Sequence, residues 1–81
     1  KNGNIIGVVI DKDTNEPIIG CTVIVVKSDK TSSKVSTVSD INGFFSLNAN
    51  VGDEIKVQYI GYKKRRVKIL NDNPMIVYMF K

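Results

Sequence analysis

The residues of this chain whose types and spacing could do chemistry are few, and their pattern favours turns over catalysis. Asp40 and Asn42 have the spacing that opens a calcium loop, but the glycine and the downstream glutamate of an EF-hand are misplaced. Asp and Asn side chains also accept hydrogen bonds from the backbone just ahead of them, and Gly43 tolerates positive φ. We therefore assign residues 40–43 to a tight hairpin turn and expect no bound metal there.

Nothing else in the chain has the pattern of a catalytic centre. Histidine, the commonest general base, is absent, and no serine lies in a Gly-x-Ser-x-Gly motif. Asp53 and Glu54 are neighbours in an expected strand, so their carboxylates should diverge. Cys21, the single cysteine, lies at one end of an apolar strand, where we expect a buried, inert thiol. We predict a non-enzymatic domain with no catalytic residue, no cofactor and no metal.

A basic run beside a tyrosine is the candidate for anion binding. Lys63, Lys64, Arg65 and Arg66 hold four of the twelve cations of a chain with a net charge of +4. Neighbours in a strand point to opposite faces, so these charges should split into two directions. We therefore expect a solvated strand start and no nucleic-acid partner. Tyr62, which precedes the run, is the tyrosine most open to a stacking role.

The elements that must position these residues are short β-strands. Apolar β-branched runs and period-two alternation predict seven, at residues 5–10, 21–27, 34–39, 44–48, 54–60, 63–70 and 75–80. Turns are expected at residues 11–17, 40–43, 50–53 and 71–74, an exposed loop at 28–33, and bends at Gly20 and Gly61. Because no window has a sustained 3.6-residue period, we expect no helix. This pattern is typical of a sandwich or a barrel.

The same alternation predicts the core. Ile55, Val57 and Tyr59 share one face of their expected strand, with polar residues between them. Phe45 and Leu47 follow the hairpin turn at the same spacing. We expect these five side chains to lock two facing layers of extended chain.

Several apolar residues should then point outward. If Ile5, Gly7 and Val9 face the core, the residues between and after them face solvent, and the alternate residues of three other strands do likewise. The residues expected to point outward are Ile6, Val8, Ile10, Ile24, Val26, Phe44, Ile76, Tyr78 and Phe80. The core positions expected in the strands of Phe44, Ile76, Tyr78 and Phe80 are Phe45, Met75, Val77 and Met79. The candidate interaction residues are Ile6, Val8, Ile10, Ile24 and Val26, together with Tyr62, Lys63, Lys64, Arg65 and Arg66.

Two explanations of the outward apolar set stay open. A contiguous apolar patch marks a partner surface, either for another domain of a parent chain or for a second copy of this one. Alternatively, loops cover these residues, or they simply satisfy β-propensity.

The chain length fits one domain, residues 1–81. We expect a piece excised from a longer polypeptide, because the chain starts at Lys1 without a methionine. No apolar stretch approaches the ~20 residues that a membrane-spanning helix needs. These residues contain no signal peptide, and we expect that a secretory signal, if one existed, has been removed.

A series of short motifs, in order along the chain, resembles a known family. The motifs are Gly7-Val-Val-Ile-Asp11, Thr14-Asn-Glu-Pro17-Ile, Gly20-Cys-Thr-Val23-Ile-Val25, Ser39-Asp40-Ile-Asn-Gly43-Phe-Phe45-Ser-Leu47, Gly52-Asp53-Glu-Ile55 and Tyr59-Ile-Gly-Tyr62. Together they resemble the carboxypeptidase-regulatory-like domain. The most similar variety stands at the N-terminus of SusC/RagA-type TonB-dependent outer-membrane transporters.

The resemblance implies an all-β fold: a seven-stranded antiparallel Greek-key β-sandwich of the transthyretin (prealbumin) type. It also implies a non-catalytic periplasmic domain of a glycan or peptide importer in the outer membrane of a Gram-negative bacterium. The partners that it implies are the plug and barrel of the parent transporter, TonB or a surface lipoprotein; a homodimer is a further expectation. The alternative is a carbohydrate-binding or adhesive β-sandwich module of a secreted or cell-surface protein.

Overall fold

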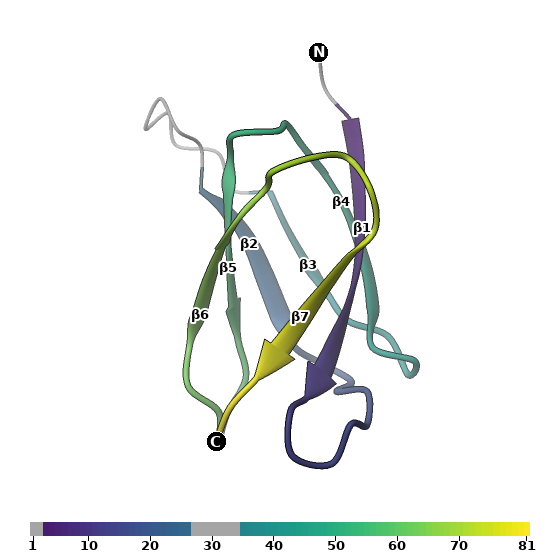
Figure 1. Cartoon of the computed structure of the whole chain (residues 1–81), viewed down its shortest axis with the longest axis vertical. Helices are drawn as coiled ribbons and strands as arrows, with labels where there is room; N and C mark the ends of the chain where they lie inside the picture. Colours follow the sequence, from purple (N-terminus) through teal and green to yellow (C-terminus); the bar gives the residue numbers. More distant parts are fainter. Residues whose placement is uncertain (1–2, 27–34) are drawn as a thin grey trace.

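The computed structural model describes residues 3–26 and 35–81 as a set of β-strands (Figure 1). The strands are β1 (Gly3–Asp11), β2 (Thr22–Val26), β3 (Ser36–Val38), β4 (Phe44–Ala49), β5 (Glu54–Gln58), β6 (Arg65–Lys68) and β7 (Met75–Met79). In these described ranges no helix is long and apolar enough to cross a membrane. The loop expected at residues 28–33, and the strand ends expected at Lys27 and Lys34, lie outside the described residues.

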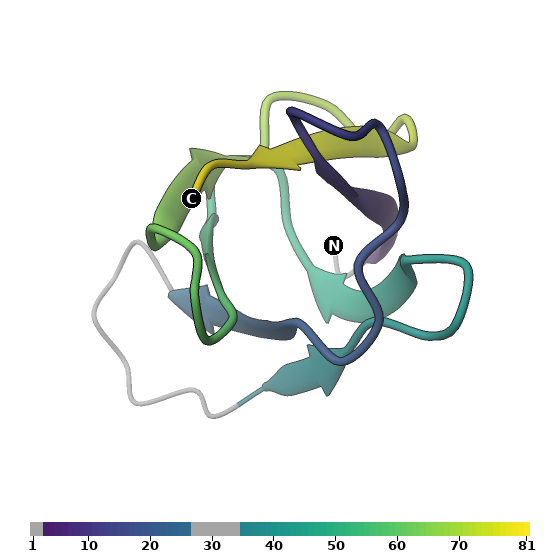
Figure 2. The same cartoon turned by 90° about the horizontal axis from the view of Figure 1, so that it is seen from below.

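The strands form two sheets, with the orders β4-β1-β7 and β3-β2-β5-β6. Seen from below, they surround a common interior (Figure 2). The all-β prediction is confirmed. The expectation of wholly antiparallel pairing is wrong at one place, because β1 and β7 pair in parallel, from Gly7 opposite Met75 to Asp11 opposite Met79. Side-chain alternation within a strand carries no information about its neighbour's direction, and the long connection between these strands permits a parallel pair.

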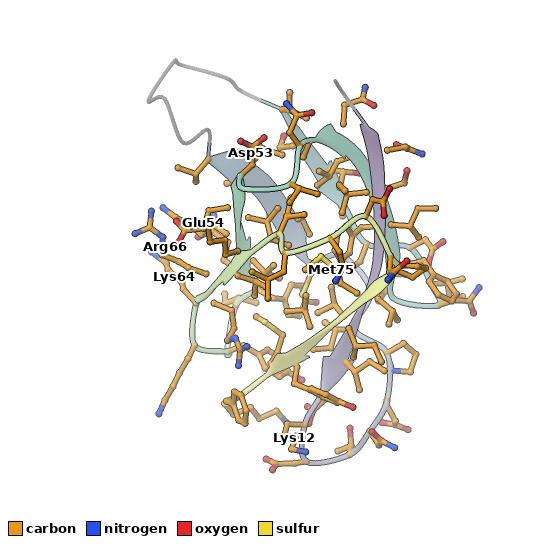
Figure 3. The ribbon with its side chains drawn as sticks, turned by 45° about the horizontal axis from the view of Figure 1, so that its top comes forward. Lys12, Asp53, Glu54, Lys64, Arg66 and Met75 are labelled. Atoms are coloured by element: carbon orange, nitrogen blue, oxygen red, sulfur yellow. The ribbon has the colours of Figure 1, made fainter. Side chains whose placement is uncertain are left out.

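One face of each sheet supplies the core. Phe45, Leu47, Ile55 and Val57 are at most 5% exposed, as the alternation predicts. The complete set of buried apolar residues is Ile5, Val9, Ile18, Cys21, Val23, Val25, Phe45, Leu47, Ala49, Ile55, Val57, Ile69, Val77 and Met79. Met75 is partly buried against this set, and in Figure 3 it lies between the two sheets.

Tyr59 is the exception among the five expected locking residues, and its assignment to the core is wrong. β5 ends at Gln58, and Tyr59 is 36% exposed. A turn follows at once, closed by the bond from Tyr62 N–H to the Tyr59 carbonyl (3.1 Å), with Gly61 at a φ of 87°. The strand therefore stops before Tyr59 can reach the interior. The next strand is also shorter than the expected residues 63–70.

The hairpin turn before β4 has the hydrogen bonds that its sequence predicts. Asp40 Oδ1 accepts from Asn42 N–H (2.9 Å) and from Phe44 N–H (3.0 Å). Gly43 has a φ of 79°, and a Cβ there would lie 2.7 Å from the Val9 carbonyl oxygen, so the turn requires glycine. The turn role of Asp40 is confirmed.

Candidate interaction surface

The outer face of the three-stranded sheet carries a continuous apolar row. β1 is the central strand of this sheet, and its inward residues alternate with Ile6, Val8 and Ile10. Val8 lies directly opposite Phe44 on β4 and opposite Ile76 on β7. Side chains opposite one another across paired strands are in contact range. The row Phe44–Val8–Ile76 therefore crosses all three strands.

The rest of this sheet face extends the row and then becomes polar. Ile10 lies opposite Tyr78, and Lys12 Nζ sits 4.8 Å from the centre of the Tyr78 ring. At the other end Ser46 Oγ donates to Asn4 Oδ1 (3.1 Å). We define the apolar face as six residues: Ile6, Val8, Ile10, Phe44, Ile76 and Tyr78. Ile6, Phe44 and Ile76 are 45–58% exposed, and the other three are half-buried.

Ile24 and Val26 do not belong to this face. They point outward from β2 in the other sheet, where they lie opposite Lys56 and Glu54 of β5. Both are half-buried. The outward apolar residues predicted from alternation therefore divide between two separate surfaces, which the sequence alone could not tell apart. Phe80 also stands apart, because it follows the end of β7 and its ring lies 5.5 Å from the Arg65 guanidinium carbon.

The basic run splits as strand geometry predicts. Arg66 points outward, where its Nε lies 3.4 Å from Glu54 Oε1. Arg65 points the other way, toward Phe80. Figure 3 shows Lys64, Arg66 and Glu54 together on the outer side of β5 and β6. Lys63 is exposed, and its N–H donates to the Phe80 carbonyl (2.7 Å).

Tyr62 has a structural role because it binds the buried carboxylate of Asp11, a contact that the sequence analysis missed. Its hydroxyl donates to Asp11 Oδ2 at 2.5 Å. Asp11 Oδ1 accepts from Asp13 N–H (2.8 Å) and Thr14 N–H (3.0 Å), and Lys81 Nζ is 3.9 Å from Oδ2. The Asp11 side chain is only 6% exposed. This cluster joins the end of β1, the β5–β6 turn and the C-terminal residue.

The Asp11–Tyr62 hydrogen bond changes the acidity of both groups. The bond from the Tyr62 hydroxyl, helped by the Thr14 N–H, lowers the pKa of Asp11 below its usual 3.8. Because that bond holds the phenol proton, and because the ring is partly desolvated, the pKa of Tyr62 rises to about 12. The hydrogen bond between Tyr62 and Asp11 therefore holds the β5–β6 turn against the end of β1. Near neutral pH the tyrosine keeps its proton and the carboxylate stays ionised, so neither group exchanges a proton there.

Two shallow hollows flank Tyr59. The first, about 260 Å³, is lined by the Asp11–Tyr62–Lys81 cluster and by Ile18 and Ile19, among others. The second, about 390 Å³, is lined by Thr22, Gln58, Tyr59, Ile60 and Lys64. The Tyr59 and Tyr62 rings have centres 6.0 Å apart and are inclined at 43°. Among the residues that the structure describes, Asp11 and Glu16 are the carboxylates that line these hollows.

The thiol and the other buried polar groups have structural roles. Cys21 is completely buried, which confirms the burial predicted from sequence, and that burial raises the pKa of its thiol to about 11. Ser39 Oγ accepts from Cys21 N–H (2.8 Å) and donates to the Ile18 carbonyl (2.6 Å). Asp53 is buried and accepts from Asn50 N–H (3.0 Å), whereas Glu54 points outward, so the two carboxylates diverge as expected.

Potential metal ligands do not gather in the described part of the chain. Residues 3–26 and 35–81 contain no group of three Cys, Asp or Glu side chains placed to hold an ion.

The comparison with known families agrees with this architecture. The sequence model of the CarboxypepD_reg-like domain family matches residues 5–80, so the chain belongs to the carboxypeptidase-regulatory-like domain family. Among individual proteins, it is 36% identical over 61 residues to the TonB-dependent receptor SusC of Bacteroides thetaiotaomicron. The match covers 75% of this chain and 6% of that receptor, so the chain corresponds to a small part of its relative.

Proposed function

We propose that this chain is a non-catalytic accessory domain of a TonB-linked outer-membrane receptor, held through its apolar face against another part of the same polypeptide. Membership of the regulatory-like family and the similarity to SusC support the receptor context. In that context the domain lies on the periplasmic side of the outer membrane of a Gram-negative bacterium, ahead of the plug and barrel. TonB and a surface lipoprotein are the further partners that such a receptor offers.

The absence of catalysis is part of the proposal, and the uses of the reactive groups support it. The Asp11 carboxylate is saturated by donors, the Tyr62 hydroxyl is engaged by that carboxylate, and the Cys21 thiol is buried. Asp53 is occupied within its own turn. Groups that are engaged in this way stabilise the sandwich and leave its outer surface as the working part of the molecule.

The observation that carries the proposal is the apolar row across the three-stranded sheet. Half-exposed side chains such as Phe44 and Ile76 each present roughly 100 Å² of surface, so the apolar face totals a few hundred Å². A free dimer needs about 800 Å² from each partner. A tethered neighbour needs less, because the tether supplies an effective concentration of roughly millimolar order. The size of the face therefore favours another part of the same polypeptide over a second copy.

Site-specific photo-crosslinking in the intact receptor tests this proposal. A photoreactive residue in place of Ile76 should link the domain to another segment of the same chain, without a change in the mass of the receptor. The matched control is a photoreactive residue in place of Ser36, which is exposed on β3 at the opposite edge of the other sheet from β6. A product of twice the receptor mass would identify a second copy, and a heavier mixed product would identify TonB or the lipoprotein; either one refutes the assignment of the occupant. No link at all from Ile76 would remove the face from the proposal.

A further inference from the structure

The outer edge of β6 is a free strand edge. β6 is the last strand of its sheet. Ile69, just after it, directs its N–H to the Asp53 carbonyl (2.8 Å) and its carbonyl to Gly52 N–H (2.9 Å), both on the β5 side. Because backbone groups alternate in direction along a strand, those of Arg66 and Lys68 point away from β5. In the described residues no backbone group bonds to them.

The same residues carry positive side chains on the outer face of the sheet. Lys64, Arg66 and Lys68, which we call the cationic edge, recur at every second position. Lys56 on β5 lies directly opposite Arg66. Glu54, whose Oε1 lies 3.4 Å from Arg66 Nε, is directly opposite Lys68 on the same face. Within the described ranges, Lys56, Lys64 and Lys68 have no ion-pair partner.

One cross-strand pair of this face, Lys56 opposite Arg66, is unfavourable for the isolated domain. Like charges directly opposite each other on paired strands destabilise a sheet. Arg66 is 59% exposed and Glu54 is 40% exposed in their side chains, so their contact is largely solvated and relieves little of the repulsion. A partner that brings carboxylates to the edge removes the repulsion and makes new attractions.

We propose that the cationic edge binds an extended acidic segment of a partner protein, which adds to β6 as a further antiparallel or parallel strand. The backbone groups of Arg66 and Lys68 supply the ladder hydrogen bonds. Carboxylates at alternate positions of the added strand lie beside Lys64, Arg66 and Lys68, because both strands repeat at roughly 6.6–6.8 Å for every two residues. This inference does not depend on the apolar face or on the receptor context.

The charge pattern also selects the partner. Lysines on an edge strand oppose pairing with apolar or basic strands, which is a common protection against aggregation. The same charges attract an acidic strand, so they discriminate between partners. A nucleic acid or another polyanion would meet the charges but would leave the edge backbone groups of β6 unpaired. Hydrogen bonding to the backbone therefore distinguishes the proposed partner from a general polyanion.

Titration of the isotope-labelled domain with a synthetic peptide tests the proposal. The probe is a peptide of about eight residues in which glutamate alternates with threonine. NMR should show saturable shifts along β6 at peptide concentrations up to about 1 mM, and slower hydrogen exchange at the Arg66 and Lys68 amides. Lys68→Glu should weaken binding roughly five- to tenfold, because an attraction becomes a repulsion. The matched control is Lys12→Glu, which makes the same change in charge at the far end of the other sheet and should alter the affinity by less than about twofold.

Two further probes separate strand addition from charge attraction. A peptide with the same sequence and N-methylated alternate backbone nitrogens keeps its carboxylates and loses its ladder donors, so it should bind at least about fivefold more weakly. Oligothymidylate of similar charge should leave the exchange of the Arg66 and Lys68 amides unchanged. The proposal is overturned if the N-methylated peptide binds as tightly as its parent, if oligothymidylate protects the two amides equally, or if the parent peptide causes no shifts. Urea denaturation of Lys68→Glu verifies that the variant remains folded.

Discussion

Replacing Gly7 by alanine tests whether the Phe45 ring sets the packing of the three-stranded sheet. Gly7 lies on the central strand β1, directly opposite Phe45 and also opposite Met75. The Phe45 ring lies over Gly7, where a Cβ atom would overlap ring carbons and would lie 2.9 Å from Met75 Cγ. Ordinary carbon contacts begin at about 3.5 Å, so both side chains would have to move.

The expected cost follows from two opposed effects. Overpacking of a filled core costs about 1–3 kcal/mol. Alanine in a strand gains about 0.5–1 kcal/mol over glycine, because the unfolded chain has less freedom to lose. Taking the middle of each range, Gly7→Ala should therefore lower the free energy of unfolding by about 1 kcal/mol. A domain of this length has a total of roughly 4–12 kcal/mol, so the loss is large enough to measure.

Urea unfolding, followed by circular dichroism and tyrosine fluorescence, gives the measurement. Gly3→Ala is the matched control on the same strand, because the nearest atom to a Cβ there is 3.7 Å away. It should be neutral or slightly stabilising. A double-mutant cycle with Phe45→Leu locates the effect: with the ring removed, Gly7→Ala should lose at least about 1 kcal/mol of its cost. If Gly7→Ala is as stable as the parent, or if the two changes are additive, the packing argument is wrong.

Three further predictions concern the core and the buried titratable groups. Ile55→Ala should cost about 2–5 kcal/mol because Ile55 is fully buried, whereas Ile60→Ala, at an 88% exposed site, should leave the urea midpoint nearly unchanged. Stability should fall as pH rises from about 9 toward 11, because the raised pKa of Cys21 stabilises the fold only while the thiol keeps its proton, and Cys21→Ala should flatten this part of the pH profile. Tyr62→Phe should raise the pKa of Asp11 toward its usual value, as carbon NMR of the carboxyl would report; it should also reduce the stability that is lost as pH falls below about 4, since a depressed pKa stabilises the fold only above it. An unchanged Asp11 titration in Tyr62→Phe would contradict the assigned hydrogen bond.

Alternation predicted most of the core because each strand is short and has one buried face. Phe45, Leu47, Ile55 and Val57 lie where a period of two places them. The prediction that Tyr59 lies in the core was wrong because the apolar alternation in the sequence continues past the residue at which the strand ends. Gly61 gave the signal of a bend, but a glycine does not show how many residues before it leave the strand.

The candidate surface could be predicted only in part. Alternation in the sequence shows which residues of a strand point outward, but it does not show which strands lie beside it. Val8, Phe44 and Ile76 form one row because β1 pairs with both β4 and β7, and the parallel pairing of β1 with β7 has no local sequence signal. Ile24 has the same local pattern and yet lies on the other sheet. The contact between Asp11 and Tyr62 spans 51 residues and involves two groups outside the strands predicted from the sequence.

The two outer faces of the sandwich differ in the forces that they can use, and this difference is measurable. The apolar face buries uncharged side chains, so its contacts depend on the exclusion of water and change little with salt. The cationic edge is solvated, so its contacts weaken as the ionic strength rises. In about 0.5 M salt, where the screening length is roughly 4 Å, the acidic peptide should be released from β6, whereas crosslinking from the position of Ile76 in the receptor should persist. If both contacts were lost together, a single electrostatic surface would have to account for them. That result would contradict the separation of the outward residues into two sheets with different partners.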